Sequence, residues 1–255
     1  MAAASLSGRV ALITGGGSGI GRGLAQELHA LGNLVVIAGR RRQTLEETTA
    51  ANPGMKSLTL DIEDPAAIRA FAAQVATEFP ALNVLINNAG IMRAEDLLEQ
   101  KDLTDAEATV TTNLLGPIRL TAALLPHLRK QPRAAIVNVS SGLAFLPLAL
   151  TPTYCATKAA IHSYTESLRY QLRGTPIEVL ELVPPYVQTY LMNGANDPLA
   201  MPLDQFIAEV MEILKTQPTP TEICVEAVKG LRFSAAGGKY GVIFAGLNEA
   251  RPDGH

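Results

Sequence analysis

The sequence predicts a doubly wound α/β fold, in which a central parallel sheet carries helices on both faces. Short apolar, β-branched runs alternate with segments of helix length through most of the chain. Strands that alternate with helices need right-handed crossovers, and these place helices on both faces of an open sheet. The chain has 255 residues, 47% hydrophobic and 18% charged, which is enough to bury a sizeable core. Because no linker-like stretch breaks the alternation, we expect a single domain over residues 1–255.

The six predicted strands are short apolar runs between turn residues. They are Val10–Thr14, Leu34–Ala38, Ser57–Leu60, Val84–Asn87, Ala135–Val139 and Ile177–Val183. Pro184-Pro185 ends the last of them, because neither residue can donate to a strand ladder. Tyr186–Asp204 then has the composition of a loop, and an apolar helical run follows at Phe206–Leu214. We expect residues from about 186 to 215 to form a lid over the substrate site.

Composition excludes several classes of protein. The absence of Trp and the formal net charge of −3 argue against a nucleic-acid partner. No apolar run approaches the ~20 residues that span a bilayer, so no membrane partner is expected. Cys155 and Cys224 have neither metal spacing nor a disulfide framework, which suggests a reducing, cytoplasmic environment. We expect no metal site, because the four histidines are scattered: His29, His127, His162 and His255.

A glycine-rich turn joins the first strand to a helical pattern. It reads Gly15-Gly16-Gly17-Ser18-Gly19-Ile20-Gly21. Glycines at such a turn let a diphosphate approach the helix N-terminus, where free N–H groups and the dipole favour negative charge. A nucleoside triphosphatase is excluded, because Arg22 and Gly23 stand where its loop needs Lys and Ser/Thr. Taken alone, the turn is equally compatible with an ordinary tight turn.

Tyr154 and Lys158 lie four residues apart in a helical run that ends near Leu172, so they share one helix face. An ammonium beside a phenol favours the phenolate, so the pKa of Tyr154 is expected to fall from about 10 toward the working pH. Ser141 leaves the fifth strand at the edge where open α/β sheets bind ligands. Asn113 is a poor residue for a helix interior, and its carboxamide is expected to bridge ordered water to Lys158. Each feature also has a structural explanation as a turn, a kink or an amphipathic helix.

Together and in this order, the segments resemble the short-chain dehydrogenase/reductase family. The T-G-x-x-x-G-x-G spacing of residues 14–21 resembles the family's cofactor loop, and the likeness runs from about Gly8 to about Thr189. It implies a Rossmann-type domain that transfers hydride between a nicotinamide cofactor and a carbonyl or secondary alcohol. It also implies a catalytic tetrad with four roles: water relay, substrate hydrogen bond, proton donation, and ribose binding that lowers the tyrosine pKa. The residues in those roles are Asn113, Ser141, Tyr154 and Lys158, in that order.

The resemblance further implies which residues contact the cofactor: Gly15, Ser18, Gly19, Ile20, Gly21, Asp61, Ile62, Asn88, Ala89, Gly90, Tyr154, Lys158, Pro184, Val187 and Thr189. Asp61 is alternatively a helix N-cap. The second strand is followed by Arg40 and Arg41, and no acid occurs before Glu46, although an NAD site places a carboxylate there. Because guanidinium groups bind a 2′-phosphate bidentately, the two arginines predict NADP(H) rather than NAD(H). The alternative is that they only solvate the start of a helix.

The segment Gly142–Pro152 is apolar and lies next to the predicted site, which favours a hydrophobic ketone or aldehyde unless it packs as core. The resemblance implies a homodimer through helices at Thr104–Leu125 and Tyr154–Leu172, with a tetramer as the alternative. Pro185 departs from the family's P-G-x-V-x-T and is expected to restrict lid motion. The tail around Tyr240–Phe244 lacks the usual glycine-rich strand ending, which argues against the family's tetramer interface there. It resembles a subgroup named for its association with lipoteichoic-acid D-alanylation.

Two alternative functions stay open. One is a non-catalytic NADP-binding redox sensor, against which the intact Ser–Tyr–Lys set argues. The other is an epimerase or dehydratase that retains its cofactor, although the residues after Val183 supply only a small substrate region. Turnover, or cofactor retained through purification, would separate them.

Overall fold

The computed structural model describes residues 7–99, 102–217 and 220–249. Within these residues the strands form one parallel sheet of seven, in the order β3-β2-β1-β4-β5-β6-β7. The strands are β1 (Val10–Thr14), β2 (Leu34–Gly39), β3 (Lys56–Thr59), β4 (Val84–Asn87), β5 (Ala134–Val139), β6 (Ile177–Leu182) and β7 (Glu222–Ile223). The predicted fold class is confirmed, and the six predicted strands are present with only their ends shifted. The sequence analysis missed β7, which is too short to show an apolar run.

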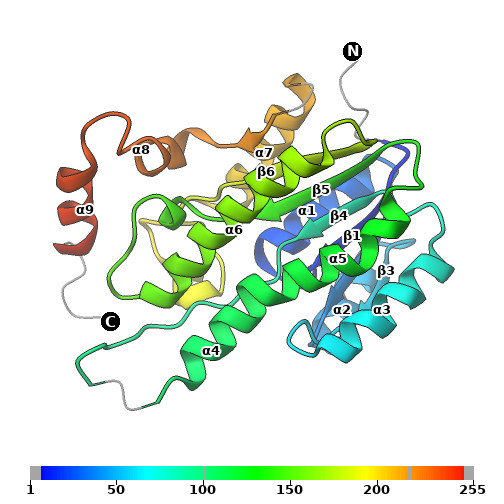
Figure 1. Ribbon diagram of the computed structural model, residues 1–255, viewed down its shortest axis with the longest axis horizontal. Coiled ribbons are helices and arrows are strands. Elements are labelled where there is room, and N and C mark those ends of the chain that lie inside the picture. Colours follow the sequence, from blue (N-terminus) through cyan, green and yellow to red (C-terminus); the bar gives the residue numbers. More distant parts are fainter. Residues whose placement is uncertain (1–6, 100–101, 218–219, 250–255) are drawn as a thin grey trace.

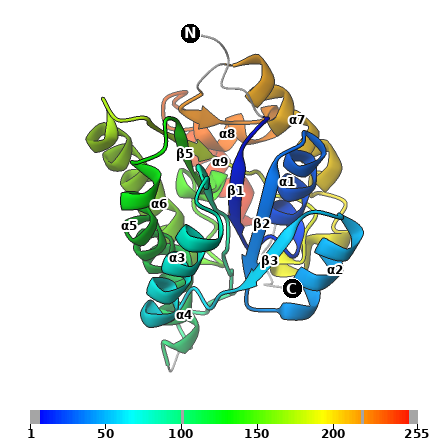
Figure 2. The same ribbon diagram turned by 90° about the vertical axis from the view of Figure 1, so that its right-hand side faces the viewer.

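Helices cover both faces of this sheet, as Figures 1 and 2 show. One face carries α1 (Gly19–Ala30), α2 (Arg42–Ala51) and α7 (Leu203–Thr216), and the other carries α3 (Pro65–Glu78), α5 (Gly116–Leu128) and α6 (Pro152–Leu172). Side chains alternate along each buried strand, so Ile13 packs with the first group and Leu12 with the second. Both faces of the central strands are therefore core, which explains their continuous apolar runs.

The predicted helix Thr104–Leu125 is interrupted. It consists of α4 (Thr104–Val110), a π-helical turn at Thr111–Leu115, and α5. A π turn inserts an extra residue into the helix and is frequent at functional sites. This turn contains Asn113.

The chain after β6 is only partly a loop. Residues Leu191–Asn196 form a 3₁₀ helix, and the predicted helical run Phe206–Leu214 lies within α7. Phe206 is fully buried and Val210 nearly so, because the apolar stripe of α7 packs on the sheet beside α1. The lid was expected over residues 186–215. Its helical half, which belongs to α7, packs in the core instead.

The C-terminal part of the described chain is helical, with a 3₁₀ turn at Glu226–Val228, then α8 (Lys229–Arg232) and α9 (Tyr240–Glu249). α9 lies at one end of the molecule (Figure 1). No helix among the described residues is long and apolar enough to cross a membrane.

The strand order reverses between β1 and β4, which are neighbours although they are not consecutive in the chain. Open α/β sheets bind ligands beyond the carboxyl ends of the strands at such a reversal. The glycine loop follows β1, and Asn88 follows β4. The topology therefore brings these two segments to one edge of the sheet.

Candidate active site

The glycine loop between β1 and α1 is held by the chain that follows β4. Thr14 Oγ1 accepts hydrogen bonds from Asn88 N and Ala89 N, both at 3.0 Å. Asn88 Nδ2 donates to Thr14 O at 2.9 Å. Gly15 has a φ of 69°, and a Cβ at Gly21 would overlap the Gly15 carbonyl and the Asn88 carboxamide. The loop is thus a tight cradle with no room for a side chain at these two glycines, as close approach of a diphosphate requires.

The helix that follows the cradle keeps its first N–H groups available. Ser18 is the N-cap residue of α1 and makes no side-chain capping bond in the described structure. The first N–H groups of a helix have no partner within the helix. Gly19 adopts a φ of 52°, and Ile20 packs partly into the core. The positive end of α1 is therefore presented at the cradle.

Arg40 and Arg41 follow β2 beside this loop. Arg41 Nη2 donates to Ser18 Oγ at 3.3 Å, so Arg41 reaches the cradle. Arg40 Nη1 donates to Glu63 Oε1 at 2.6 Å. No acid occurs between β2 and Glu46 in the sequence, but the fold brings Glu63 to Arg40 because β2 and β3 are neighbours and Glu63 follows β3. The Arg40 side chain is therefore held by an acid that follows the neighbouring strand.

Asp61 and Ile62 have different surroundings. The Asp61 side chain is exposed and accepts a hydrogen bond from Glu63 N at 3.0 Å. The N-cap of α3 is Asp64, which accepts from Ala66 N, so the N-cap explanation for Asp61 is wrong. Ile62 is buried in the core, so its side chain does not face the cradle.

Asn113 fixes the backbone that follows Asn88-Ala89-Gly90. Its Oδ1 accepts from Ile91 N, and its Nδ2 donates to Ile91 O, both at 2.8 Å. Nδ2 also donates to Thr157 Oγ1 at 3.3 Å. Both amide protons are therefore used within the protein, and only one lone pair of Oδ1 is left for the predicted water. A Cβ at Gly90 would lie 3.3 Å from Asn113 Oδ1 and 3.8 Å from Lys158 Nζ, so this segment borders the lysine.

Ser141, Tyr154 and Lys158 meet at the carboxyl end of β5. Tyr154 is in the first turn of α6, where Glu95 Oε2 accepts a hydrogen bond from Thr153 Oγ1 at 2.7 Å and ties down the helix start. The Ser141 side chain interacts with the Tyr154 hydroxyl. Lys158 Nζ lies 5.6 Å from the centre of the Tyr154 ring and donates to Val139 O at 2.8 Å. The structure thus brings together three of the four predicted catalytic side chains, with Asn113 behind them.

The protonation of this group differs from the expectation in one respect. Burial raises the pKa of Tyr154 to about 12, and the interaction with Ser141 only partly opposes it. Burial lowers the pKa of Lys158 to about 8. In the chain without cofactor the pKa of Tyr154 is therefore raised rather than lowered, because desolvation of a phenolate outweighs the effect of its neighbours. Tyr154 is a neutral phenol, ready to donate a proton.

Apolar side chains pack around Tyr154. Tyr154 clusters with Leu148 and Cys155, and the half-buried members of the cluster are Met92, Leu143, Leu150 and Leu247. Leu247 comes from α9, whose Asn248 accepts from Ala149 N at 2.6 Å. The loop after Ser141 and the C-terminal helix therefore build an apolar surface beside the tyrosine. The sequence analysis did not foresee the part played by α9.

The segment after β6 contacts both the catalytic group and the glycine loop. Pro184 O accepts from Gly142 N at 2.9 Å, next to Ser141. Val187 is buried and bridges to Met201. Thr189 Cγ2 would lie 3.3 Å from a Cβ at Gly19, so Thr189 touches the glycine loop. These predicted contact residues thus join the cradle to the catalytic group.

Sequence reasoning missed a polar cluster behind the site. His162 was expected to be an isolated histidine, but its Nδ1 lies 2.8 Å from Oε2 of the fully buried Glu181. Glu222 of β7 pairs in register with Glu181 and is held by Arg232 at 2.7 Å. The signal in the sequence was an acid inside the apolar run Ile177–Val183.

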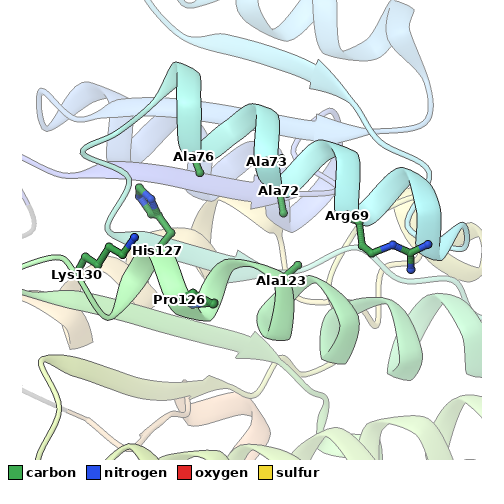
Figure 3. A pocket seen from close by; sticks show the side chains of 8 residues that line it. All are labelled: Arg69, Ala72, Ala73, Ala76, Ala123, Pro126, His127 and Lys130. Carbon is green, nitrogen blue, oxygen red and sulfur yellow. The ribbon is translucent and has the colours of Figure 1, made fainter.

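A separate hollow of about 420 Å³ lies between α3 and α5 (Figure 3). Alanines form much of its wall, and Arg69, His127 and Lys130 lie around it. His127 Nε2 lies 3.2 Å from Leu82 O, just before β4, so this end of the hollow is at the amino ends of the strands, away from the catalytic group.

The chain is similar to known proteins over the segments that form this site. Residues 9–200 match the family described as short chain dehydrogenase. The chain is 39% identical over 249 residues to "Uncharacterized oxidoreductase DltE" of Bacillus subtilis (strain 168), covering 95% of this chain and 98% of that protein. It is 33% identical over 195 residues to "11-beta-hydroxysteroid dehydrogenase 1A" of Arabidopsis thaliana, covering 74% of this chain and 55% of that protein. The crystal structure of a short chain dehydrogenase from Burkholderia cenocepacia J2315 in complex with NADP has a TM-score of 0.80 and 26% identity, covering 95% of this chain and 98% of that one.

Proposed function

The chain belongs to the short-chain dehydrogenase/reductase family of oxidoreductases, and on that premise we propose that it transfers hydride between NADP(H) and a carbonyl or secondary alcohol, with a hydrophobic ketone or aldehyde as substrate. The observation that carries this proposal is the group formed by Ser141, Tyr154 and Lys158 at the carboxyl end of β5. A sensor that only binds a dinucleotide has no use for a buried proton donor beside an apolar surface.

The cradle fits a dinucleotide. The glycine loop leaves no room for a Cβ at Gly15 or Gly21, and the N-terminus of α1 faces it. When bound, the nicotinamide cofactor supplies or accepts the hydride. Thr189, which touches the loop at Gly19, would hold the nicotinamide end, and Lys158 would hold its ribose.

The catalytic side chains act on the carbonyl oxygen. Ser141 and Tyr154 donate hydrogen bonds to it, which orients the carbonyl and polarises its carbon for hydride attack. Tyr154 gives its phenolic proton to this oxygen as hydride reaches the carbon. The nearby Lys158 ammonium stabilises the phenolate that is left, so a phenol that holds its proton in the resting protein becomes an acid during the reaction. In the direction of alcohol oxidation, Tyr154 accepts the proton of the hydroxyl group instead of donating one.

Arg40 and Arg41 support NADP(H) over NAD(H). Both guanidinium groups lie at the end of β2, and Arg41 contacts the loop residue Ser18. A 2′-phosphate would draw Arg40 from its exposed contact with Glu63 into a charge-assisted contact. The solved relative from Burkholderia cenocepacia, which is in complex with NADP, agrees with this choice.

The apolar cluster around Tyr154 supports a hydrophobic substrate. Leu148, Met92 and Leu247 come from three different segments and offer no charged group to a substrate acid or sugar. The Arabidopsis thaliana relative named as a hydroxysteroid dehydrogenase points to the same class of substrate.

We also propose a cytoplasmic homodimer. Ala156, Ala159 and Ser163 are exposed on α6, where small side chains allow a second α6 to approach closely. Cys155 and Cys224 are free thiols, as in proteins of reducing compartments. Sedimentation of wild type and Ala159→Arg tests the assembly: a dimer should become a monomer, and an unchanged mass would exclude this interface.

The proposed activity is tested with a panel of apolar ketones, aldehydes and diketones, each assayed with NADPH and with NADH. Tyr154→Phe should lose at least about a hundredfold in turnover, the scale of general acid catalysis, while binding cofactor as before. Tyr170→Phe is the matched control, because Tyr170 lies on the same helix with its side chain exposed, and it should keep full activity. Cofactor binding without any oxidoreduction would favour a redox sensor. Cofactor that survives purification and is not consumed in turnover would favour an epimerase or dehydratase.

A further inference from the structure

Glu181 places a carboxylate among the buried, mostly apolar residues of β6. Along β6, Ile177 and Val179 pack with α5 and α6 while Leu180 and Leu182 pack on the other face, so alternation places Glu181 on the α6 side. Its side chain is fully buried. Among the described residues, Oε1 has no hydrogen-bond partner. Burial of such a group costs several kcal/mol unless it is compensated, so its presence calls for an explanation.

Glu181 lies beside the catalytic lysine. Lys158 Nζ donates to Val139 O, and Val139 of β5 is paired with Leu182, the residue next to Glu181. Lys158 and His162 are four residues apart on α6, so they share the helix face that covers these strands. His162 Nδ1 binds Glu181 Oε2 at 2.8 Å. The ammonium and the carboxylate therefore occupy the same layer between α6 and the sheet.

Lys158 needs a counter-charge, and Glu181 is the one available from this layer. In the part of the chain that the structure describes, Lys158 makes no direct ion pair. Burial lowers the pKa of Lys158 to about 8, and the Glu181 carboxylate opposes this fall. Glu222, the other acid of the cluster, is bound through both oxygens by Arg232 at 2.7 Å. Its charge is thereby balanced locally.

We propose that Glu181 is a positioning residue of the active site, whose buried carboxylate, held by His162, is the counter-charge that keeps Lys158 in its ammonium form. Its effect on turnover rests on the proposed function, because only there does the ammonium stabilise the Tyr154 phenolate. Its effect on the charge of Lys158 does not.

Other ionisable groups also face the cluster, and they define its boundary. Glu166, on the same helix, lies 3.8 Å from His162 Nε2. Cys224, after β7, donates from Sγ to Glu222 Oε2 at 3.8 Å. The His162 side chain is 20% exposed, so it links the buried carboxylate to the surface. With Glu181 ionised, Nδ1 must carry the proton of this hydrogen bond, because a carboxylate only accepts.

The test measures the protonation of Lys158 directly in the full chain without ligand. In protein labelled with ¹³C at lysine Cε, the Lys158 signal is assigned by its loss in Lys158→Met and followed by NMR against pH. Its midpoint should be about 8 in the wild type. Glu181→Gln should lower this midpoint by roughly one pH unit, the size of a neighbouring-charge effect. The matched control is Glu178→Gln on the same strand, where Glu178 forms a half-exposed pair with Arg133, and it should leave the midpoint unchanged.

A second pair of variants keeps the test decisive if Glu181→Gln does not fold. His162→Leu removes the hydrogen bond that holds the Glu181 carboxylate within the described residues, so the carboxylate is no longer fixed beside Lys158 and the Lys158 midpoint should fall as before. His162→Asn keeps an N–H donor and should preserve the midpoint. A wild-type midpoint in Glu181→Gln, or in His162→Leu if the former is unfolded, overturns the proposal.

Turnover separates this inference from the proposed function. If the protein reduces apolar carbonyls, the basic limb of its pH profile should move to lower pH in Glu181→Gln, with Glu178→Gln as the control. An inactive protein in which the Lys158 midpoint still shifts would refute the proposed function and support the role of Glu181. An active protein with an unshifted midpoint would do the reverse.

Discussion

Replacing Arg40 with Asp should move the cofactor preference from NADPH toward NADH. Arg40 lies at the end of β2, and its half-exposed side chain is paired with Glu63 at 2.6 Å. Binding of a 2′-phosphate exchanges this pair for a contact with the phosphate. The free energies of the ion pair and of the phosphate contact can be compared.

An exposed ion pair such as Arg40 with Glu63 is worth about 0–1 kcal/mol. A hydrogen bond to a charged group contributes about 1.5–3 kcal/mol. The exchange therefore gains about 0.5–3 kcal/mol, which is roughly 2- to 140-fold in the dissociation constant for NADPH. Arg40→Ala should lose this factor for NADPH and leave NADH binding unchanged. Arg40→Asp should lose more, because Asp repels the phosphate and accepts a hydrogen bond from the ribose of NADH.

The assay is a parallel titration of the protein with NADPH and NADH, followed by nicotinamide fluorescence. The chain has no Trp, so tryptophan emission does not interfere. Arg42→Asp is the matched control: Arg42 is adjacent, but its side chain is 80% exposed and paired with Glu46 along α2. The ratio of the two dissociation constants should change in Arg40→Asp and stay constant in Arg42→Asp. An equal response of both variants, or none in either, would refute the 2′-phosphate argument.

Three further variants or conditions have defined outcomes. Because burial holds the pKa of Lys158 at about 8, kcat/KM for NADPH should decline as the pH rises through that value and the ammonium is lost; a flat profile to pH 10 would contradict this. Gly21→Ala should abolish cofactor binding in a titration, since its Cβ would overlap the glycine loop, whereas Gly230→Ala, with open space around it, should bind normally. Phe206→Ala should lower the free energy of unfolding by about 3–5 kcal/mol in urea denaturation, because this fully buried ring anchors α7. Leu199→Ala, with the side chain 80% exposed, should change it by less than about 0.5 kcal/mol.

The inner strands β1, β2, β4, β5 and β6 could be predicted because each is an apolar run that the sheet largely buries. The meeting of Tyr154 with Lys158 could also be predicted, since it depends only on helical spacing. The position of Ser141 after β5 could be predicted as well, because strand ends in a parallel sheet share one edge. These features follow from local sequence and from one rule of topology.

The remaining features depend on which elements become neighbours. Glu63 reaches Arg40 only because β3 lies beside β2, and α9 reaches Tyr154 only through the packing of Leu247. The raised pKa of Tyr154 follows from its degree of burial, which spacing does not specify. Glu181 showed a signal, an acid in an apolar strand, but its partner His162 is 19 residues away and meets it only when α6 packs on β6.

The same dependence explains the outcome for the expected lid. The sequence predicted a loop over Tyr186–Asp204, which is only partly confirmed because Leu191–Asn196 is a 3₁₀ helix, and it assigned the apolar stripe after this segment to the lid. An apolar stripe of this kind is also typical of a helix that packs on the core. Because α7 packs beside α1, its stripe belongs to the core.

Deuterium transfer from NADPH that carries deuterium at both C4 positions of the nicotinamide tests the central claim most directly. With an apolar ketone or aldehyde as acceptor, mass spectrometry should find one deuterium on the carbinol carbon of the product formed by the wild type. Tyr154→Phe should form none above background, while Tyr170→Phe should match the wild type. An alcohol product without the label, or full transfer by Tyr154→Phe, would contradict direct hydride transfer with Tyr154 as the proton donor.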